Sequence, residues 1–166
     1  MREEGIVVVK EEKKSFLGKL FRLAMFAVAV YGAVTAAKKA MTRLSRRLEE
    51  ENEGNEKKRF LTFLNGRTVS LADETVAEIE MNTVASGVEL DLSETELSGD
   101  EEICVRALLS AVVIKVPPMV CVEVDDTNII SGFMNLVPNY EQDILPVIHI
   151  KVQSLLSCVK IEMQTE

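Results

Sequence analysis

The sequence predicts a mainly β protein: a single-domain β-solenoid, or rolled β-sandwich, of stacked short strands, preceded by an N-terminal hydrophobic and basic α-helix. Two observations lead to this fold class. A short β-type run recurs five times in residues 60–166, and an uncharged apolar stretch lies between basic residues nearer the N-terminus. Repeated units of this length bury their apolar sides by stacking on their neighbours. We therefore expect one body of stacked strands.

The N-terminal region is divided into a tail, residues 1–12, and a helix, residues 13–50. The tail contains one β-prone run, 6–9, whose pairing partner the sequence does not reveal. The helix contains an uncharged stretch, 23–37, that would be about 22 Å long. A spanning helix needs about 20 residues, so the stretch spans only if the preceding turn joins it and the basic side chains there reach the headgroups.

The helix is expected to contact a membrane or a protein partner. The residues that we assign to this surface are Phe16, Leu20, Leu23, Phe26, Val30, Tyr31, Val34, Lys38 and Lys39. Three arrangements remain open: a helix that spans or is embedded in the membrane, one that lies in the interface, and a soluble one packed on the body or on a partner. A signal peptide is disfavoured because acidic residues precede the apolar stretch and two lysines close it.

A charged run, residues 51–59, separates the helix from the repeats and is interpreted as a solvated linker. Beyond it, five pairs of small or turn-forming residues each precede a short β-type run. Their second members are 21, 24, 21 and 26 residues apart. We expect these pairs where the backbone turns sharply or where neighbouring units approach closely. The pairs are Asn65-Gly66, Ser86-Gly87, Ser110-Ala111, Ser131-Gly132 and Ser157-Cys158.

Apolar and polar residues alternate on both sides of these pairs. Val88, Leu90 and Leu92 share one face of a predicted strand, and residues 148, 150 and 152 share one face of another. Such alternation is typical of strands with one buried and one solvated face. No part of residues 60–166 has a convincing helical period.

The net charge of −8 conceals two regions of opposite sign. Residues 1–59 contain 14 basic and 9 acidic residues, whereas residues 60–166 contain 5 basic and 18 acidic ones. The acidic body would repel phosphate, so no nucleic acid is expected as a partner. Residues 13–48, with nine basic and no acidic residues, suit an anionic membrane surface. Three cysteines without paired spacing favour reduced, buried thiols and hence the cytoplasmic side of a membrane.

No residue pattern predicts catalysis, a metal or a cofactor. His149 is the only histidine and is expected to face solvent on its strand. The recurrent serines suit turns, because a nucleophile would occur once and beside a base. Glu89, Asp91, Asp125 and Asp126 follow no calcium-loop spacing. We therefore expect no enzyme, no cofactor and no small-molecule substrate.

Residues 60–163 resemble the LiaF-like C-terminal domain family of cell-wall-active antibiotic response proteins. The segments that carry the resemblance are 83–93, 106–117 and 122–133, which contain Leu-Asp-Leu-Ser, Ile-Lys-Val-Pro and Val-Glu-Val-Asp in the family's order. The family's Phe-Gly-Gly turns read here as Leu-Asn-Gly, Ala-Ser-Gly, Leu-Ser-Ala, Ile-Ser-Gly and Leu-Ser-Cys. The resemblance implies a bacterial, membrane-associated modulator of envelope-stress signalling.

The expected function is that of a non-enzymatic, membrane-associated accessory or regulatory protein that binds protein partners through its β domain. Its expected place is the cytoplasmic membrane, with the β domain on the cytoplasmic side, or else the cytoplasm. One alternative is a bactofilin-like scaffold that self-associates, because the ends of a strand stack invite assembly. Another is a small protein whose soluble helix packs on its β domain.

Overall fold

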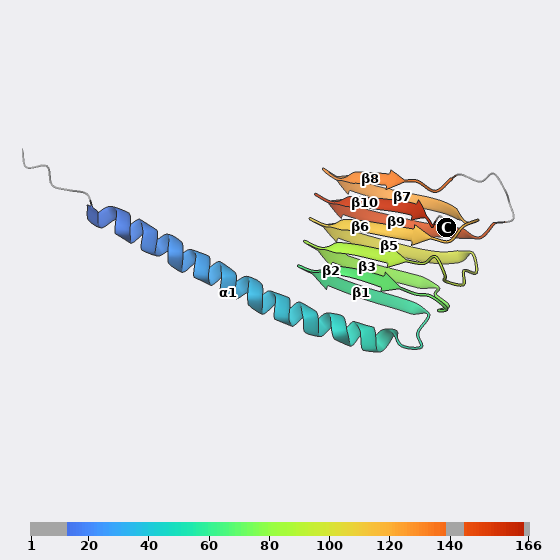
Figure 1. Cartoon of the computed structure of the whole chain (residues 1–166), viewed down its shortest axis with the longest axis horizontal. Coiled ribbons are helices and arrows are strands. Elements are labelled where there is room, and N and C mark those ends of the chain that lie inside the picture. The colour runs from blue at the N-terminus through green and yellow to red at the C-terminus, as the bar shows by residue number, and fades with distance from the viewer. Residues whose placement is uncertain (1–12, 139–144, 165–166) are drawn as a thin grey trace, which may run out of the picture. The chain divides into compact units, whose positions relative to one another are not determined.

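The computed structural model describes residues 13–138 and 145–164 (Figure 1). The chain forms two compact units, residues 1–37 and residues 38–166, so the last turns of the helix belong to the same unit as the strands. The expected short strand at residues 6–9 lies outside the described residues.

One helix, α1 (Lys13–Asn52), contains 40 residues. It has no proline, and alanine and long unbranched side chains dominate it, which favours the helical conformation. The helix ends two residues after the expected position. Gly54 follows in the left-handed region, at φ 71°, which is the usual way for a helix to stop.

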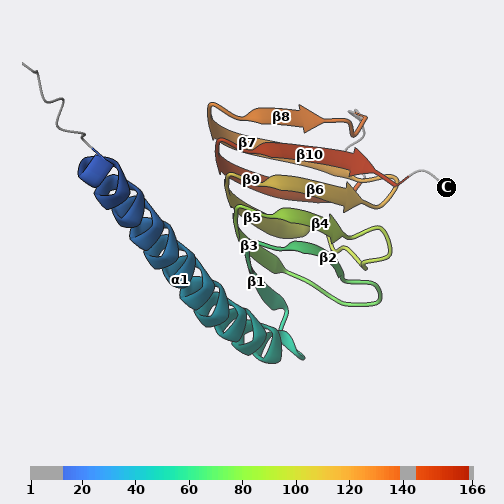
Figure 2. The ribbon, with the colours of Figure 1, turned by 60° about the vertical axis from the view of Figure 1, so that its left-hand side comes forward.

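In the described part of the chain, ten strands form two parallel five-stranded sheets, which confirms the predicted mainly β class. In spatial order, the first sheet contains β1 (Lys57–Phe63), β3 (Glu78–Val84), β5 (Asp100–Leu108), β9 (Val147–Leu155) and β7 (Cys121–Ile129). The second contains β2 (Gly66–Ser70), β4 (Gly87–Asp91), β6 (Ala111–Val116), β10 (Cys158–Met163) and β8 (Gly132–Asn135). Each strand of the first sheet continues through a short bend into a strand of the second, an arrangement compatible with a solenoid (Figure 2).

The pairs of strands do not stack in the order of the sequence. The last pair, β9 and β10, lies between the third pair, β5 and β6, and the fourth pair, β7 and β8. Strand β9 is hydrogen-bonded to β5 along one side and to β7 along the other. The repeat predicts the strands themselves, but this insertion has no signal in the spacing of the small pairs.

The core lies between the two sheets and consists almost wholly of aliphatic side chains. Alternation along each strand places them there, as predicted. Val88, Leu90 and Leu92 are buried on one side, and Ile148, Ile150 and Val152 on the other. His149 and Lys151, between the latter three, are exposed.

The predicted linker at 51–59 is wrong at both ends. Helix α1 continues to Asn52, and β1 already begins at Lys57, so the connection is residues 53–56. The three basic residues at 57–59 can form a strand because each of them pairs with a carboxylate. Lys57 pairs with Glu78, Lys58 with Glu74, and Arg59 with Glu80. Charge alone therefore does not mark a linker here.

Candidate functional site

The apolar part of α1 exposes its large side chains. Leu20, Leu23, Phe26, Val30, Tyr31 and Val34 are all exposed, and so are Phe21, Met25 and Val28 between them. No residue in the most apolar 18-residue window of this helix is buried. Lys38 and Lys39 follow the apolar stretch and are exposed. Phe16 lies in the first turn of the helix, but its side chain is outside the described part. This helix is long and apolar enough to cross a membrane.

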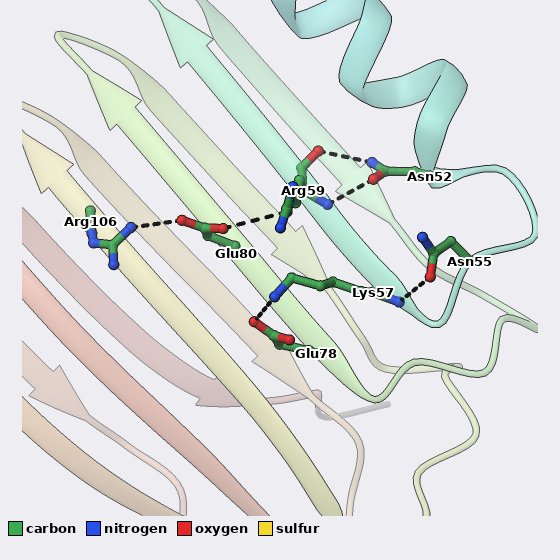
Figure 3. A network of polar contacts seen from close by, with 7 residues as sticks. All are labelled: Asn52, Asn55, Lys57, Arg59, Glu78, Glu80 and Arg106. Carbon is green, nitrogen blue, oxygen red and sulfur yellow. Dashed lines mark hydrogen bonds and ion pairs between the residues drawn. The ribbon is translucent and has the colours of Figure 1, made fainter.

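The outer edge of β1, which we call the head edge, is occupied by a side chain (Figure 3). The Asn52 carboxamide donates to the Arg59 carbonyl oxygen at 2.9 Å and accepts from the Arg59 N–H at 2.8 Å. It thus makes the two hydrogen bonds that a neighbouring strand would make. Asn52 is buried, and its own carbonyl oxygen accepts from Lys58 Nζ at 3.0 Å. The role of Asn52 could not be predicted, because nothing in the charged run around it distinguishes a residue that caps a sheet edge.

A hollow beside the head edge is lined by mixed polar and apolar groups, among them Glu49, Lys58, Phe60, Arg67 and Glu74. Its two cations already have anionic partners. Lys58 pairs with Glu74, and Arg67 pairs with Glu49 while its guanidinium lies 5.5 Å from the centroid of the Phe60 ring. The first pair joins the loop after β2 to β1, and the second joins the last turn of α1 to β2. The hollow therefore has a structural explanation and does not by itself indicate an anion site.

Charged side chains form rows across the outer face of the first sheet. Glu80 lies between two arginines, with its carboxylate 2.7 Å from Arg106 Nη1 and 3.6 Å from Arg59 Nε (Figure 3). Partial burial acts to raise the pKa of Glu80, but hydrogen bonds from Asn82 and Arg106 and the charges of the two arginines lower it below its ordinary value. These rows join neighbouring strands, so they are part of what holds the sheet together.

The five small pairs occupy one common position, at the bends between the two sheets. Gly66, Gly87, Ala111, Cys158 and Gly132 are aligned in register across the second sheet. We define the bend edge as five eight-residue segments, each made of the four residues before a pair, the pair itself and the two residues after it: 61–68, 82–89, 106–113, 127–134 and 153–160. Figure 2 shows the bends on one edge of the body, with the longer connections on the opposite edge.

The predicted reason for the small residues is wrong for the glycines. The residue in the left-handed region is the one before each pair: Leu64, Ala85, Leu109, Ile130 or Leu156, at φ 49–52°. Gly66 and Gly87 are not in that region, and a Cβ atom at either would meet nothing within 4 Å. Neither conformation nor close approach therefore requires glycine there.

The serines of the pairs have a specific role, because they form a ladder through the bends. Ser110 Oγ accepts from the Ser86 N–H at 3.2 Å, and Ser157 Oγ accepts from the Ser110 N–H at 3.1 Å. Ser131 Oγ accepts in the same way from the Ser157 N–H. Each of the four hydroxyls also donates to a carbonyl oxygen two residues earlier. The serines thus satisfy backbone groups that the bends would leave without partners. Asn65 holds the equivalent position at the head end.

The outer edge of β7, which we call the tail edge, is free of strand partners within the described residues. Glu123 and Asp125 are exposed on it. Asp126 is exposed as well, but it is aligned with Val152, a fully buried residue, so its carboxylate occupies a position on the terminal strand that faces the core in β9. Asn128 donates to that carboxylate at 2.5 Å. An acidic terminal strand with an inward-pointing charge is a common protection against unwanted strand pairing.

The described residues hold no group of three or more potential metal-ligating side chains. His149 Nδ1 lies 3.2 Å from a carboxylate oxygen of Glu123, and both side chains are exposed. The expectation of buried thiols is wrong for Cys104, a free thiol that is half-buried, and for Cys158, a free thiol that is exposed at its bend. Glu89 pairs with Lys115, and Asp91 accepts two hydrogen bonds from Ser93. Each of these acidic groups therefore has a local structural partner.

Comparisons with protein-family models, with curated proteins and with solved structures found no match to this chain. The features of the molecule on which a function can rest are thus an exposed apolar helix, a closed head edge, the bend edge and an open acidic tail edge.

Proposed function

We propose that this protein is a non-enzymatic, membrane-anchored accessory protein whose β body binds protein partners on the cytoplasmic side. The observation that carries the proposal is the apolar stretch of α1, residues 23–37, whose large side chains are exposed and which has basic residues on both sides. Water is an unfavourable surrounding for such a surface, whereas a bilayer buries it and places the lysines and arginines among the headgroups.

The tail edge is the surface that we assign to partner binding. Strand β7 has hydrogen-bonding backbone groups along its outer side, where an added strand of a partner could pair. Its side chains Glu123, Asp125 and Asp126 favour a partner segment rich in lysine or arginine and repel a second copy of the same edge. The free thiols fit a reducing compartment and thus the cytoplasmic side.

A role in envelope-stress signalling is the narrower form of this proposal, and it rests on the resemblance to LiaF-like domains alone. Deletion of the gene should then change the induction of a cell-wall-antibiotic response reporter. An unchanged reporter response would contradict the envelope-stress role but not the proposal that the protein is membrane-anchored and binds protein partners.

The bactofilin-like alternative has less support. A head-to-tail filament needs an open strand edge at both ends of the stack, but the Asn52 carboxamide occupies the head edge. The alternative of a soluble helix packed on the β domain predicts full-length protein in the soluble fraction, which membrane fractionation tests. Filaments of the full chain in electron micrographs would restore the first of these alternatives.

Membrane fractionation of the full-length protein tests the proposal. We expect the protein in the membrane fraction, and retention after alkaline carbonate would identify a spanning or embedded helix in place of one lying in the interface. The double variant Val30→Asp, Val34→Asp should become soluble, since each acid costs roughly 2.5–3.5 kcal/mol at the centre of a spanning helix.

A matched control introduces the same two charges, four residues apart, outside the apolar stretch. The double variant Ala40→Asp, Leu44→Asp, at two exposed positions of α1, should leave the fractionation unchanged. A full-length protein that is wholly soluble at physiological salt would contradict the proposed anchoring.

A further inference from the structure

The bend edge differs in charge from the rest of the β body. Its forty residues include three basic residues, Arg67, Arg106 and Lys160, and a single acidic one, Glu89. The remainder of residues 60–166 contains two basic and seventeen acidic residues. The connections at the opposite edge of the body contribute exposed acids such as Glu94 and Glu96. Arg67, Arg106 and Lys160 pair with Glu49, Glu80 and Glu162, so the bend edge is close to neutral, whereas the opposite edge repels an anionic surface.

The same edge exposes a ridge of large aliphatic side chains. The residue two positions before each serine ends a strand of the first sheet. The residue immediately before the serine has its backbone in the left-handed region. In the last three bends of the stack these positions are aliphatic and exposed: Leu108, Leu109, Leu155, Leu156, Ile129 and Ile130. Ile130 is 82% exposed. Register between the strands places these residues next to one another, so they form one continuous surface.

Neither the fold nor the turn explains these side chains. A left-handed residue at an exposed bend is best supplied by glycine or asparagine, and a β-branched residue there is a genuine outlier. Ile130 is nevertheless in this conformation, at φ 52°, as are Leu109 and Leu156. The exposure of these aliphatic side chains to water and the strain of their backbone conformation each reduce the stability of the fold. Both costs indicate a use other than the folding of the body.

We propose that the bend edge is a second lipid-contacting surface, which lies on an anionic membrane with its aliphatic ridge at the level of the headgroups. The proposal rests on the membrane anchoring proposed above and extends it from α1 to the β body. Aliphatic side chains with scattered basic residues are the composition of surfaces that lie in a membrane interface. The acidic loops at the opposite edge then face away from the lipid.

Lipid fits this edge better than a protein partner does. The ridge consists of side chains exposed along a row of bends, and the backbone N–H groups of Leu109 and Leu156 already donate to carbonyl oxygens of the neighbouring bends. A partner strand would find free backbone groups at the tail edge instead.

Single-tryptophan fluorescence of the full-length protein tests the proposal, since the native chain contains no tryptophan. One variant is Ile130→Trp, on the ridge. The matched control is Met119→Trp, at an apolar position that is 68% exposed but lies in the connection between β6 and β7 at the opposite edge. Each variant is bound to phosphatidylglycerol–phosphatidylcholine vesicles, with and without bromine on the acyl chains.

We expect a blue shift and quenching by brominated lipid for Ile130→Trp, and neither for Met119→Trp. If both variants sediment with the vesicles but show the same fluorescence shift and the same quenching, the proposed lipid contact of the bend edge is wrong. Anchoring by α1 would not be contradicted by that result. A blue shift at position 130 without lipid quenching would overturn the lipid contact in favour of a protein contact. Protein that does not sediment with vesicles at all would overturn the anchoring itself.

Discussion

At the scale of single residues, Asn52 closes the head edge, and its removal should be costly. Asn52→Ala leaves the N–H and the carbonyl oxygen of Arg59 without their partner at the edge of the sheet. We expect a loss of about 1–3 kcal/mol in the free energy of unfolding, the usual cost of unsatisfied polar groups. Chemical denaturation measures it.

Asn55 provides the control for this prediction. It lies in the same connection and accepts one exposed hydrogen bond, from the Lys57 N–H at 3.1 Å. Asn55→Ala should cost clearly less than Asn52→Ala. Equal losses would mean that the side-chain cap is not what stabilises β1.

Two buried hydroxyls should respond in opposite directions when they are removed. Thr83 is 1% exposed, and its hydroxyl has no hydrogen-bond partner, so Thr83→Val should stabilise the protein by about 1 kcal/mol. Ser110 Oγ both accepts from Ser86 and donates to the Leu108 carbonyl oxygen, so Ser110→Ala should destabilise it by about 1–2 kcal/mol. Thermal unfolding of both variants checks the contrast, and a loss of stability in Thr83→Val would contradict the assignment of an unsatisfied hydroxyl.

The positions of some of these residues can be predicted from the sequence, whereas the roles of all of them depend on contacts between distant segments. The recurrence of Ser86, Ser110 and Ser157 is visible in the sequence, but their hydrogen bonds join units 24 and 47 residues apart. Asn52 stands in a charged run and has no local signal at all. Interactions between distant segments decide both roles, so single-sequence patterns indicate where such residues lie better than what they do.

At the scale of the elements, Asp126 on β7 should keep the tail edge from self-association. Its carboxylate takes a core-facing position at the open end of the stack. Asp126→Val would extend the apolar inner face to the last strand, and we expect concentration-dependent dimers that the native chain does not form. Light scattering after size-exclusion chromatography in detergent measures this.

A neighbouring acid separates the effect of position from that of charge. Asp125→Val removes the same charge from the outer face of β7. Asp125 is exposed there and is aligned with Lys151 of β9. Asp125→Val should cause less association than Asp126→Val. If the two variants associated equally, net charge and not the inward position would be responsible.

The elements were the most predictable level of this fold. Alternation in Val88–Leu92 and Ile148–Val152 predicts strands with one buried face, and the strands have it. The start of β1 was not predictable, because Lys57, Lys58 and Arg59 become strand residues only through carboxylates supplied from elsewhere. The stacking order of the strands was also not predictable from the sequence. It depends on which strand packs beside β5 and not on the length of the repeat.

At the scale of the whole molecule, acid should weaken the body as the carboxylates at its charge rows are protonated. The pKa of Glu80 is lowered from 4.5 and that of Asp91 from 3.8 in the folded protein. A lowered folded-state pKa contributes stability above the unfolded value, and that contribution is lost as the pH falls through the folded value. We therefore expect the free energy of unfolding to fall below about pH 4.5.

Replacement of the carboxylate tests this origin. Glu80→Gln removes the titrating group between Arg59 and Arg106, so the variant should be less stable near neutral pH and should lose less stability in acid. Glu94→Gln, at an exposed position in a loop, is the control. Parallel acid profiles for native protein and Glu80→Gln would show that other groups cause the effect.

The place of β9 and β10 in the stack has a consequence for how the chain matures during its synthesis. In an ordinary repeat protein each newly made unit can dock on the one before it as it leaves the ribosome. Here the fourth pair of strands has no neighbour to dock on until residues 147–163 have emerged and taken their place between it and the third pair. The native surroundings of the fourth pair can therefore be completed only after residue 163 has left the ribosome, and a chain that stopped shortly before residue 147 would leave the fourth pair without its native neighbour.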